Sequence, residues 1–158
     1  MIVKPDYQAK TVFEINYDKF KNEGMKFLAF DLDSTVMKSK SGKFSDEVLQ
    51  LFNNLKKDFS LMIITNNQNV EYIQKTINQI DFPVIPHAKK PLTRISQEFF
   101  NENNIDIKKM VMIGDRPLTD ILFGKFLGCK TVLVDSINWY EEKPIVRIAR
   151  SIERLVSI

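Results

Sequence analysis

The sequence predicts one α/β domain built around a doubly wound, Rossmann-like parallel sheet. Its apolar residues gather in short, near-continuous runs, which is typical of strands covered on both faces of a parallel sheet. Segments with helical spacing of apolar residues separate these runs, and strands that alternate with helices favour this class of fold. The chain has 158 residues, of which 44% are apolar and 27% charged. Length and composition therefore fit a single globular domain over residues 1–158.

The apolar runs indicate a sheet of about five strands. We expect these strands at residues 26–30, 61–64, 83–86, 110–113 and 131–134. Asp31, Thr65 and Asp115 come at the ends of three of the runs. Because ligands of such sheets bind beyond the carboxyl ends of the strands, these polar side chains outline a candidate site.

Helices are expected between the strands and at the C-terminus. Ser45 suits an N-cap, Pro91 suits a first helical turn, and Gly128 suits a helix stop. The predicted helices cover residues 45–57, 69–80, 91–103, 117–127 and 144–156. Residues 1–25 are expected to form an arm or helix before the first strand, and residues 144–158 a C-terminal helix of the same domain.

The composition excludes several classes of protein. The single Cys129 allows no intramolecular disulfide and fits a reducing compartment, and the single His87 cannot anchor a multi-histidine metal site. No run of about 20 apolar residues would span a bilayer, and the N-terminus lacks the apolar core of a signal peptide, so we expect a cytoplasmic protein. The net charge of +3 leaves anionic substrates or an anionic membrane surface open. No nucleic-acid partner is expected, since a dedicated binder shows a denser basic stripe.

Two acidic patterns point to the chemistry of the site. Asp31 and Asp33 follow the first strand, and residues i and i+2 of an extended chain point the same way. We therefore expect their carboxylates to converge while Leu32 turns into the core. A divalent cation or a proton would relieve their repulsion, and Mg²⁺ is the natural ion because it takes oxygen ligands. Asp115 would supply a further carboxylate from the end of the fourth strand, and Asp120 is expected on the first turn of the next helix.

Each of these residues also has a purely structural interpretation. An acidic residue at a strand end often caps the following turn, Thr65 can do the same, and a lysine such as Lys90 is often simply solvated. Gly114 is expected to let the chain turn tightly before Asp115. The patterns DxDxT and GDxxxxD, each after a buried strand and in this order, together favour the functional interpretation.

Four motifs give the chain a resemblance to the haloacid dehalogenase (HAD) superfamily. They are Asp31-Leu32-Asp33-Ser34-Thr35-Val36, Thr65 after the second strand, Lys90 before a proline, and Gly114-Asp115 followed by Asp120. Within the superfamily the chain is most similar to the YqeG family of class IIIA phosphatases and to the related mitochondrial phosphatidylglycerophosphate phosphatases. That likeness rests on the short segment before the first motif, on Lys90-Pro91 and on residues 114–122. Ser34, where the family often has Asn, and Arg116-Pro117 depart from the pattern without touching a motif acid.

The resemblance implies a HAD-like phosphatase that works through an aspartyl-phosphate. Asp31 would be the nucleophile, and Asp33 would protonate the leaving oxygen and then take a proton from water. Thr65 would donate its hydroxyl to a phosphoryl oxygen, and Lys90 would neutralise charge in the transition state. Asn66 is a further candidate for substrate contact.

The resemblance also implies Mg²⁺ as the cofactor. Its ligands would be the Asp31 carboxylate, the backbone carbonyl of Asp33 and the Asp115 carboxylate. Asp120 would stand behind them and orient Lys90 or a metal-bound water.

Three classes of function stay open at this point. The intervals after the first and second motifs are too short for a cap domain, since a unit below about 40 residues seldom folds alone, and an open site suits a phosphate on a large or membrane-embedded molecule. By resemblance the leading substrate is phosphatidylglycerophosphate, with peripheral contact to the inner membrane face through the basic helix 144–156 or the aromatic segment 7–20. The apolar side chains of that helix are expected to pack inward, as they would in an ordinary core helix: Ile145, Ile148, Ile152 and Leu155. The alternatives are a phosphatase for a soluble sugar, amino-alcohol or nucleic-acid-end phosphate, and a non-catalytic binding module.

Overall fold

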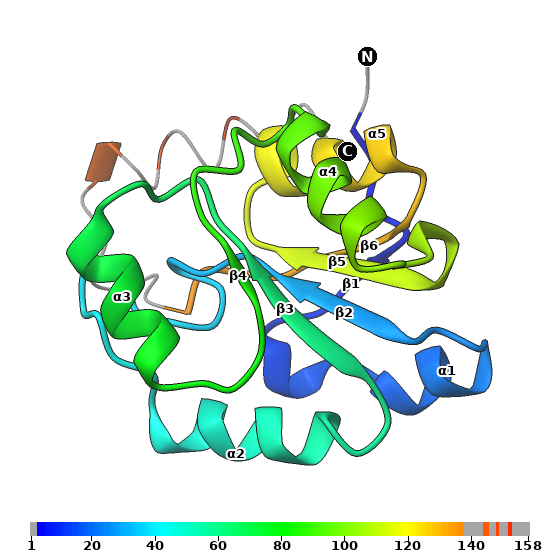
Figure 1. Cartoon of the computed structure of the whole chain (residues 1–158), viewed down its shortest axis with the longest axis horizontal. Helices are drawn as coiled ribbons and strands as arrows, with labels where there is room; N and C mark the ends of the chain where they lie inside the picture. The colour runs from blue at the N-terminus through cyan, green and yellow to red at the C-terminus, as the bar shows by residue number, and fades with distance from the viewer. Residues whose placement is uncertain (1–2, 138–143, 146–147, 149–151, 153–158) are drawn as a thin grey trace.

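A six-stranded, fully parallel sheet forms the centre of the molecule in the computed structural model (Figure 1), which describes residues 3–137, 144–145, 148 and 152. The strands are β1 (Tyr7–Gln8), β2 (Phe27–Phe30), β3 (Ser60–Ile64), β4 (Val84–Ile85), β5 (Met110–Gly114) and β6 (Lys130–Leu133). Their order is β1-β6-β5-β2-β3-β4, so the chain adds strands first on one side of β2 and then on the other. This confirms the α/β doubly wound architecture, with β1 as a strand that the sequence did not predict.

Helices between the strands cover both faces of the sheet. They are α1 (Tyr17–Asn22), α2 (Asp46–Leu55), α3 (Val70–Asn78), α4 (Arg94–Glu102) and α5 (Leu122–Leu127), with shorter turns at Val12–Glu14, Ile107–Lys109 and Pro117–Ile121. The Ser45 hydroxyl accepts the Val48 N–H at 3.2 Å as the expected N-cap of α2, and Gly128 ends α5 with φ of 83°. Helix α4 begins at Arg94, so Pro91 precedes it rather than lying in its first turn.

Two apolar cores lie on opposite faces of the sheet. Alternation along β2 sends Leu28 and Phe30 to one core and Ala29 to the other. The first core contains buried residues of α1, α2 and α3, whereas Phe100 of α4 and Phe123 of α5 belong to the second. In Figure 1, α1 and α2 lie below the sheet and α4 and α5 above it. The central strands are thus buried on both faces, which explains their near-continuous apolar sequences.

The N-terminal arm is fixed to the edge of the sheet. Strand β1 pairs in parallel with β6, with Tyr7 opposite Val132. The Asp6 carboxylate accepts the Thr131 N–H at 2.9 Å and the Thr131 hydroxyl at 3.0 Å, and Lys125 Nζ lies 3.0 Å from it. Burial alone would raise the pKa of Asp6, but these donors from Lys125 and Thr131 outweigh it and lower the pKa. The arm therefore extends the sheet instead of standing apart from it.

The predicted C-terminal helix 144–156 lies largely outside the described residues. Ile145, Ile148 and Ile152 are helical and exposed, so the expectation that these three side chains pack inward is wrong. Leu155, the fourth residue of that expectation, lies outside the described residues. Among the residues that the structure describes, no helix is long and apolar enough to cross a membrane. Within residues 3–137, the intervals after Asp33 and Thr65 hold only loops, one helix each and a strand, so no cap domain covers the sheet there.

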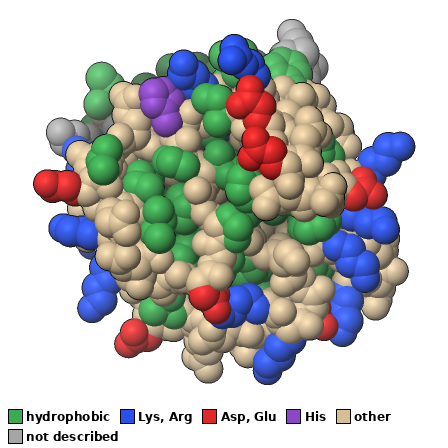
Figure 2. All heavy atoms as spheres, viewed as in Figure 1, with side chains coloured by type: hydrophobic (Ala, Val, Ile, Leu, Met, Phe, Trp, Pro, Cys, Tyr) green, Lys and Arg blue, Asp and Glu red, His purple; other side chains and the backbone are tan. Residues whose placement is uncertain are grey.

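On the face shown in Figure 2, Lys and Arg side chains lie scattered around the edge and mixed with acidic ones. Hydrophobic side chains are visible between them, as on an ordinary protein surface.

Candidate active site

The carboxyl ends of three neighbouring strands bring the predicted site residues together. Strand β2 lies between β3 and β5, with Phe30 in register with Ile63 and Ile113, so the residues that follow each strand emerge at one edge. A cavity of about 310 Å³ opens there. Its lining includes every residue that the sequence assigned to the site: Asp31, Asp33, Thr65, Asn66, Lys90, Asp115 and Asp120.

The turn after β2 carries the two acids of the first motif to the cavity. The Asp31 N–H donates to Ile113 O at 2.9 Å and continues the sheet, while Leu32 is fully buried. Ser34 then adopts a φ of 70°, and its N–H donates to Met37 O at 2.7 Å. The left-handed backbone at Ser34 closes a tight loop, in a conformation that is uncommon for residues other than glycine.

Three carboxylates form a compact cluster at the base of the cavity. Oxygens of Asp31, Asp115 and Asp120 lie within 4.8 Å of one another. The Asp33 carboxylate, which the sequence predicted beside Asp31, is not a member of this three-acid cluster. The side chain of Asp31 is 14% exposed, against 1% for Asp120, so Asp31 is the acid of this pair that a substrate can reach.

Lys90 neutralises two members of this cluster. Its Nζ lies 2.8 Å from Asp31 Oδ1 and 2.6 Å from Asp120 Oδ1, and its side chain is 1% exposed. Burial acts to lower the pKa of Lys90, but attraction to Asp120 and Asp31 outweighs it and raises the pKa. Lys90 is therefore a fixed ammonium group beside the reachable acid.

Asn66 holds the backbone of Lys90 in place. Its Oδ1 accepts the Lys90 N–H at 2.7 Å, and its Nδ2 donates to Lys90 O at 3.0 Å. Both ends of the amide are thus engaged, so the side chain fixes the loop that carries the ammonium group. A direct contact between this side chain and a substrate, which the sequence suggested, remains a prediction.

Asp120 is held by the turn that joins β5 to α5. The Arg116 N–H donates to Asp120 Oδ2 at 3.1 Å, and the turn Pro117–Ile121 is a π-helical one. Burial and repulsion from Asp31 raise the pKa of Asp120 to about 6. A Cβ atom on Gly114 would lie 2.3 Å from Asp120 Oδ2, so the glycine makes room for this carboxylate. This steric requirement is a second reason for the glycine, beside the tight turn that the sequence suggested.

Thr65 and Thr35 supply hydroxyl groups to the site. Thr65 Oγ1 accepts the Asn67 N–H at 3.0 Å, which is the turn-capping role, and its own proton remains available for donation into the cavity. The Thr35 hydroxyl lies 3.0 Å from Asp115 Oδ1 and 3.4 Å from Asp31 Oδ2. Thr35 therefore ties together the acids of the first and fourth motifs, although the sequence gave it no role beyond its place in the motif.

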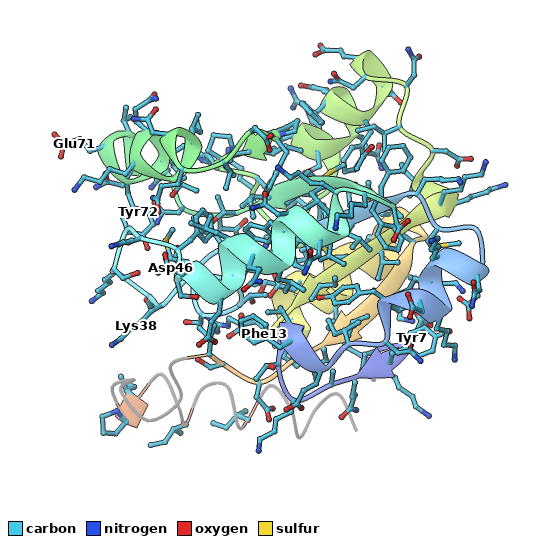
Figure 3. The ribbon with its side chains drawn as sticks, turned by 90° about the horizontal axis from the view of Figure 1, so that it is seen from below. Tyr7, Phe13, Lys38, Asp46, Glu71 and Tyr72 are labelled. Atoms are coloured by element: carbon cyan, nitrogen blue, oxygen red, sulfur yellow. The ribbon has the colours of Figure 1, made fainter. Side chains whose placement is uncertain are left out.

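Asp33 is oriented by two residues that the sequence did not single out. The Tyr72 hydroxyl donates to Asp33 Oδ1 at 2.6 Å, and Asn67 Nδ2 donates to Asp33 Oδ2 at 3.1 Å. Burial and the neighbouring Asp33 raise the pKa of Tyr72, so the phenol stays protonated as a donor. Tyr72 comes from α3 on the side toward the loop that carries Lys38 (Figure 3).

The donor set of the carboxylate cluster fits a magnesium ion. Asp31, Asp115 and Asp120 offer only oxygen atoms, close enough to bind one ion, and Mg²⁺ is typically bound by one or two carboxylates together with water and substrate phosphate. His87 and Cys129, the side chains that a softer metal would prefer, take no part in the cluster.

A family model for the mitochondrial PGP phosphatases matches residues 1–138. The chain belongs to this family. It is 29% identical over 156 residues to the probable phosphatase YqeG of Bacillus subtilis, covering 96% of this chain and 88% of that protein. It is also 27% identical over 160 residues to phosphatidylglycerophosphate phosphatase 1, chloroplastic/mitochondrial, of Arabidopsis thaliana, covering 96% of this chain and 46% of that protein. The chain thus spans less than half of the plant relative.

The fold agrees with a HAD-type phosphatase. A solved structure of the putative HAD-hydrolase YfnB from Bacillus subtilis, bound to magnesium, matches with a TM-score of 0.51 at 18% identity and covers 74% of this chain and 57% of that one. The chain is therefore a phosphatase of the HAD superfamily, related to the PGP phosphatases, and the resemblance seen in its motifs is confirmed.

Proposed function

We propose that this phosphatase is a Mg²⁺-dependent phosphomonoester hydrolase that transfers the phosphoryl group to Asp31. The observation that carries the proposal is the environment of that carboxylate. Asp31 lies at the mouth of a buried carboxylate cluster, is partly open to the cavity, and has the Lys90 ammonium 2.8 Å from its Oδ1. A carboxylate in that position can act as a nucleophile while the fixed ammonium offsets the charge of the incoming phosphate.

The reaction divides into two proton-balanced steps. Asp31 attacks phosphorus, the bond from phosphorus to the ester oxygen breaks, and Asp33 gives its proton to that leaving oxygen. Asp33 then takes a proton from the water that hydrolyses the acyl phosphate and releases Asp31. Thr65 donates its hydroxyl to a phosphoryl oxygen and Lys90 neutralises the negative charge that gathers there. Phosphate ester hydrolysis relies mainly on such positioning and charge neutralisation.

Mg²⁺ completes this proposed site. The carboxylates of Asp31, Asp115 and Asp120 would hold it, and the backbone carbonyl of Asp33 is the further ligand that the family resemblance implies. When bound, the ion supplies Lewis-acid neutralisation between the nucleophile and the phosphate.

Phosphatidylglycerophosphate is the leading substrate. The family match and the plant relative support this assignment, and the uncapped edge of the sheet leaves access for a head group on a large molecule. We place the enzyme in the cytoplasm, with peripheral contact to the inner membrane face during turnover. A soluble phosphate ester is the competing substrate class, because the same chemistry would serve it.

Replacement of the nucleophile tests the chemistry. The wild-type protein should hydrolyse p-nitrophenyl phosphate with Mg²⁺, and Asp31→Asn should lose roughly 10³-fold or more of kcat. Asp46→Asn, an exposed acid in the first turn of α2, is the matched control and should retain activity. Quenched wild-type reactions should show a hydroxylamine-sensitive phosphate on the peptide that contains Asp31. Equal activity of wild type and Asp31→Asn would contradict the proposal.

A substrate comparison tests the lipid assignment. Initial rates on phosphatidylglycerophosphate in mixed micelles are compared with rates on soluble sugar and glycerol phosphates at equal bulk concentration. A higher kcat/KM on the lipid supports the assignment. A preference for soluble esters by orders of magnitude removes the lipid and leaves the phosphatase chemistry intact.

A further inference from the structure

The chain segments around the mouth of the active-site cavity carry only basic charges. These edge segments follow β2, β3, β4 and β5 and comprise residues 34–45, 66–70, 86–94 and 116–119. Each of them contributes to the lining of the cavity. None contains Asp or Glu, and their basic side chains are Lys38, Lys40, Lys43, Lys89, Lys90, Arg94 and Arg116.

The acids of this region lie in the floor of the cavity or in the helices behind its rim. Asp115 and Asp120 are each 1% exposed, and further acids follow in the first turns of α2 and α3, at Asp46, Glu47 and Glu71. In Figure 3, Lys38 projects outward on the same side of the molecule as Tyr72. An acidic floor thus opens through a basic rim, and a basic rim attracts an anionic surface.

Three large apolar side chains project from the same edge segments. Val70 is 81% exposed, Leu92 63% and Leu118 37%. Val70 follows the N-cap residue of α3, Leu92 comes shortly after Lys90, and Leu118 lies in the turn Pro117–Ile121. One exposed apolar residue needs no explanation. Three of them, on three separate segments around one opening, form an apolar ring.

The backbone beside this ring is anchored. The Leu92 N–H donates to Lys89 O at 2.9 Å, and the Asn69 side chain accepts the Tyr72 N–H at 3.0 Å at the start of α3. Asn66 holds Lys90 through both of its backbone groups. The apolar side chains are therefore presented in fixed places, and little backbone order has to be gained on binding.

The aromatic segment 7–20, which the sequence offered as a membrane contact, is used inside the fold. Tyr7 pairs with β6, and Val12, Ile15 and Phe20 are buried in the core below the sheet. Of the two contacts expected from the sequence, only the helix 144–156 is left as a competitor of the apolar ring.

We propose that the mouth of the cavity is a membrane-docking surface. Val70, Leu92 and Leu118 enter the interfacial layer of an anionic bilayer, and the Lys and Arg side chains of the edge segments contact its head groups. The inference rests on the proposed phosphatase function and deepens it by naming the surface that meets the membrane. In this orientation the cavity opens toward the head groups, so a phosphate there reaches Asp31 without leaving the bilayer.

The charge of the rim decides between a bilayer and a second copy of the chain. A second copy docked mouth to mouth would bring the same basic side chains against this rim, and like charges repel. Separate apolar side chains around an opening also leave its centre free, which suits a fluid surface that adapts to their spacing.

Vesicle binding without catalysis tests the proposal. Sedimentation uses the full chain in EDTA with vesicles of equimolar phosphatidylserine and phosphatidylcholine, which contain no phosphate monoester. The wild type should bind these vesicles, release them as the salt concentration rises, and bind pure phosphatidylcholine weakly. Because neither Mg²⁺ nor turnover is involved, failure of the phosphatase chemistry would leave this result unchanged.

Paired variants separate the apolar from the basic contribution. Val70→Ser with Leu92→Ser should lower the partition coefficient about tenfold or more, whereas Phe126→Ser, 54% exposed in the last turn of α5, should not change it. Lys40→Gln with Lys43→Gln should lower it about fivefold for each charge removed. Lys57→Gln, an exposed position beyond the end of α2, is the charge control. Circular dichroism checks that every variant is folded.

A fluorescent label identifies the face that enters the bilayer. Leu92→Cys, Phe126→Cys and Ile148→Cys, each with Cys129→Ala, carry an environment-sensitive label, and only the label at position 92 should shift to the blue on vesicles. A shift at position 148 without one at position 92 would assign docking to the C-terminal helix and overturn the proposal. Wild-type protein that binds heparin but not the vesicles, or a Val70→Ser, Leu92→Ser variant that binds as well as the wild type, would overturn it too.

Discussion

At the level of single side chains, Tyr72 connects the body of the protein to the acid–base chemistry. Its hydroxyl donates to Asp33 Oδ1 at 2.6 Å and lies 3.3 Å from Met37 Sδ, so the phenol is fixed between α3 and the loop after β2. An acid that must meet a leaving oxygen gains from being held in one orientation. Tyr72 is therefore a positioning residue for Asp33.

Tyr72→Phe should lower kcat most for substrates whose leaving oxygen needs a proton. We expect about a tenfold loss with glycerol 1-phosphate and less than about a threefold loss with p-nitrophenyl phosphate, because a good leaving group departs without help from an acid. Tyr17→Phe is the matched control: its hydroxyl donates to Val12 O at 2.6 Å, away from the site. That variant should alter stability without changing the ratio of the two rates. Equal losses on both esters in Tyr72→Phe would show that the tyrosine has only a structural role.

The sequence predicted the acids of the site but not what holds them. Asp31 and Asp115 are visible in the sequence because each follows a buried strand, and parallel strands bring their carboxyl ends to one edge. The contact of Asp33 with Tyr72 spans 39 positions, and no local periodicity encodes such a pairing. The same holds for Asn66, whose side-chain amide forms hydrogen bonds with the N–H and the carbonyl oxygen of Lys90, 24 positions along the chain.

Among the helices and strands, α5 packs against the sheet so closely that Gly124 has no room for a side chain. A Cβ atom on Gly124 would lie 2.4 Å from Thr131 Cγ2 and 3.3 Å from Met112 Cβ. The glycine stands in the middle of α5 (Leu122–Leu127), where it costs helix propensity. Close approach of the helix to β5 and β6 is the reason for its presence.

Gly124→Ala should destabilise the protein by about 1–2 kcal/mol, because overpacking against Thr131 exceeds the gain in helix propensity. Urea unfolding followed by circular dichroism measures the change. Thr131→Ser removes the obstructing methyl group and keeps the hydroxyl that donates to Asp6. The double variant should therefore lose less free energy of unfolding than the sum of the losses in the two single variants. Simple additivity would show that the helix moves away freely instead.

Element prediction succeeded where local sequence determines the structure. The five expected strands all form, because both faces of the sheet are covered and the apolar runs are nearly continuous. Strand β1 was missed because it is two residues long and is specified by the contacts of Asp6 with Thr131 and Lys125. The start of α4 was placed early because Pro91 suits a first helical turn by type, whereas here it follows the site lysine directly.

For the molecule as a whole, the site is a cost to stability that the rest of the fold offsets. Three carboxylates gather within 4.8 Å with one ammonium group among them, and buried like charges repel. Burial of apolar surface in the two cores on either side of the sheet stabilises the fold and offsets this repulsion. A bound cation would relieve the repulsion, so binding and folding are coupled.

The pH dependence of stability should reveal this coupling through Asp120. Its folded pKa is raised from 3.8 to about 6 by burial and by Asp31, so its contribution is fully present below the unfolded pKa near 3.8 and is lost as pH rises through about 6. In EDTA, the free energy of unfolding of the wild type should fall by roughly 2–3 kcal/mol between pH 4 and 7, relative to that of Asp120→Asn. The comparison of wild type with Asp6→Asn should show the opposite trend, with the wild type gaining stability over the variant as pH rises. The reason is that Lys125 and Thr131 lower the pKa of Asp6 against the effect of burial. Urea titrations at each pH give the free energies of unfolding, and saturating Mg²⁺ should shrink the Asp120 difference. If the difference in free energy of unfolding between wild type and Asp120→Asn does not change with pH, ionisation of Asp120 does not destabilise the fold and the prediction is wrong.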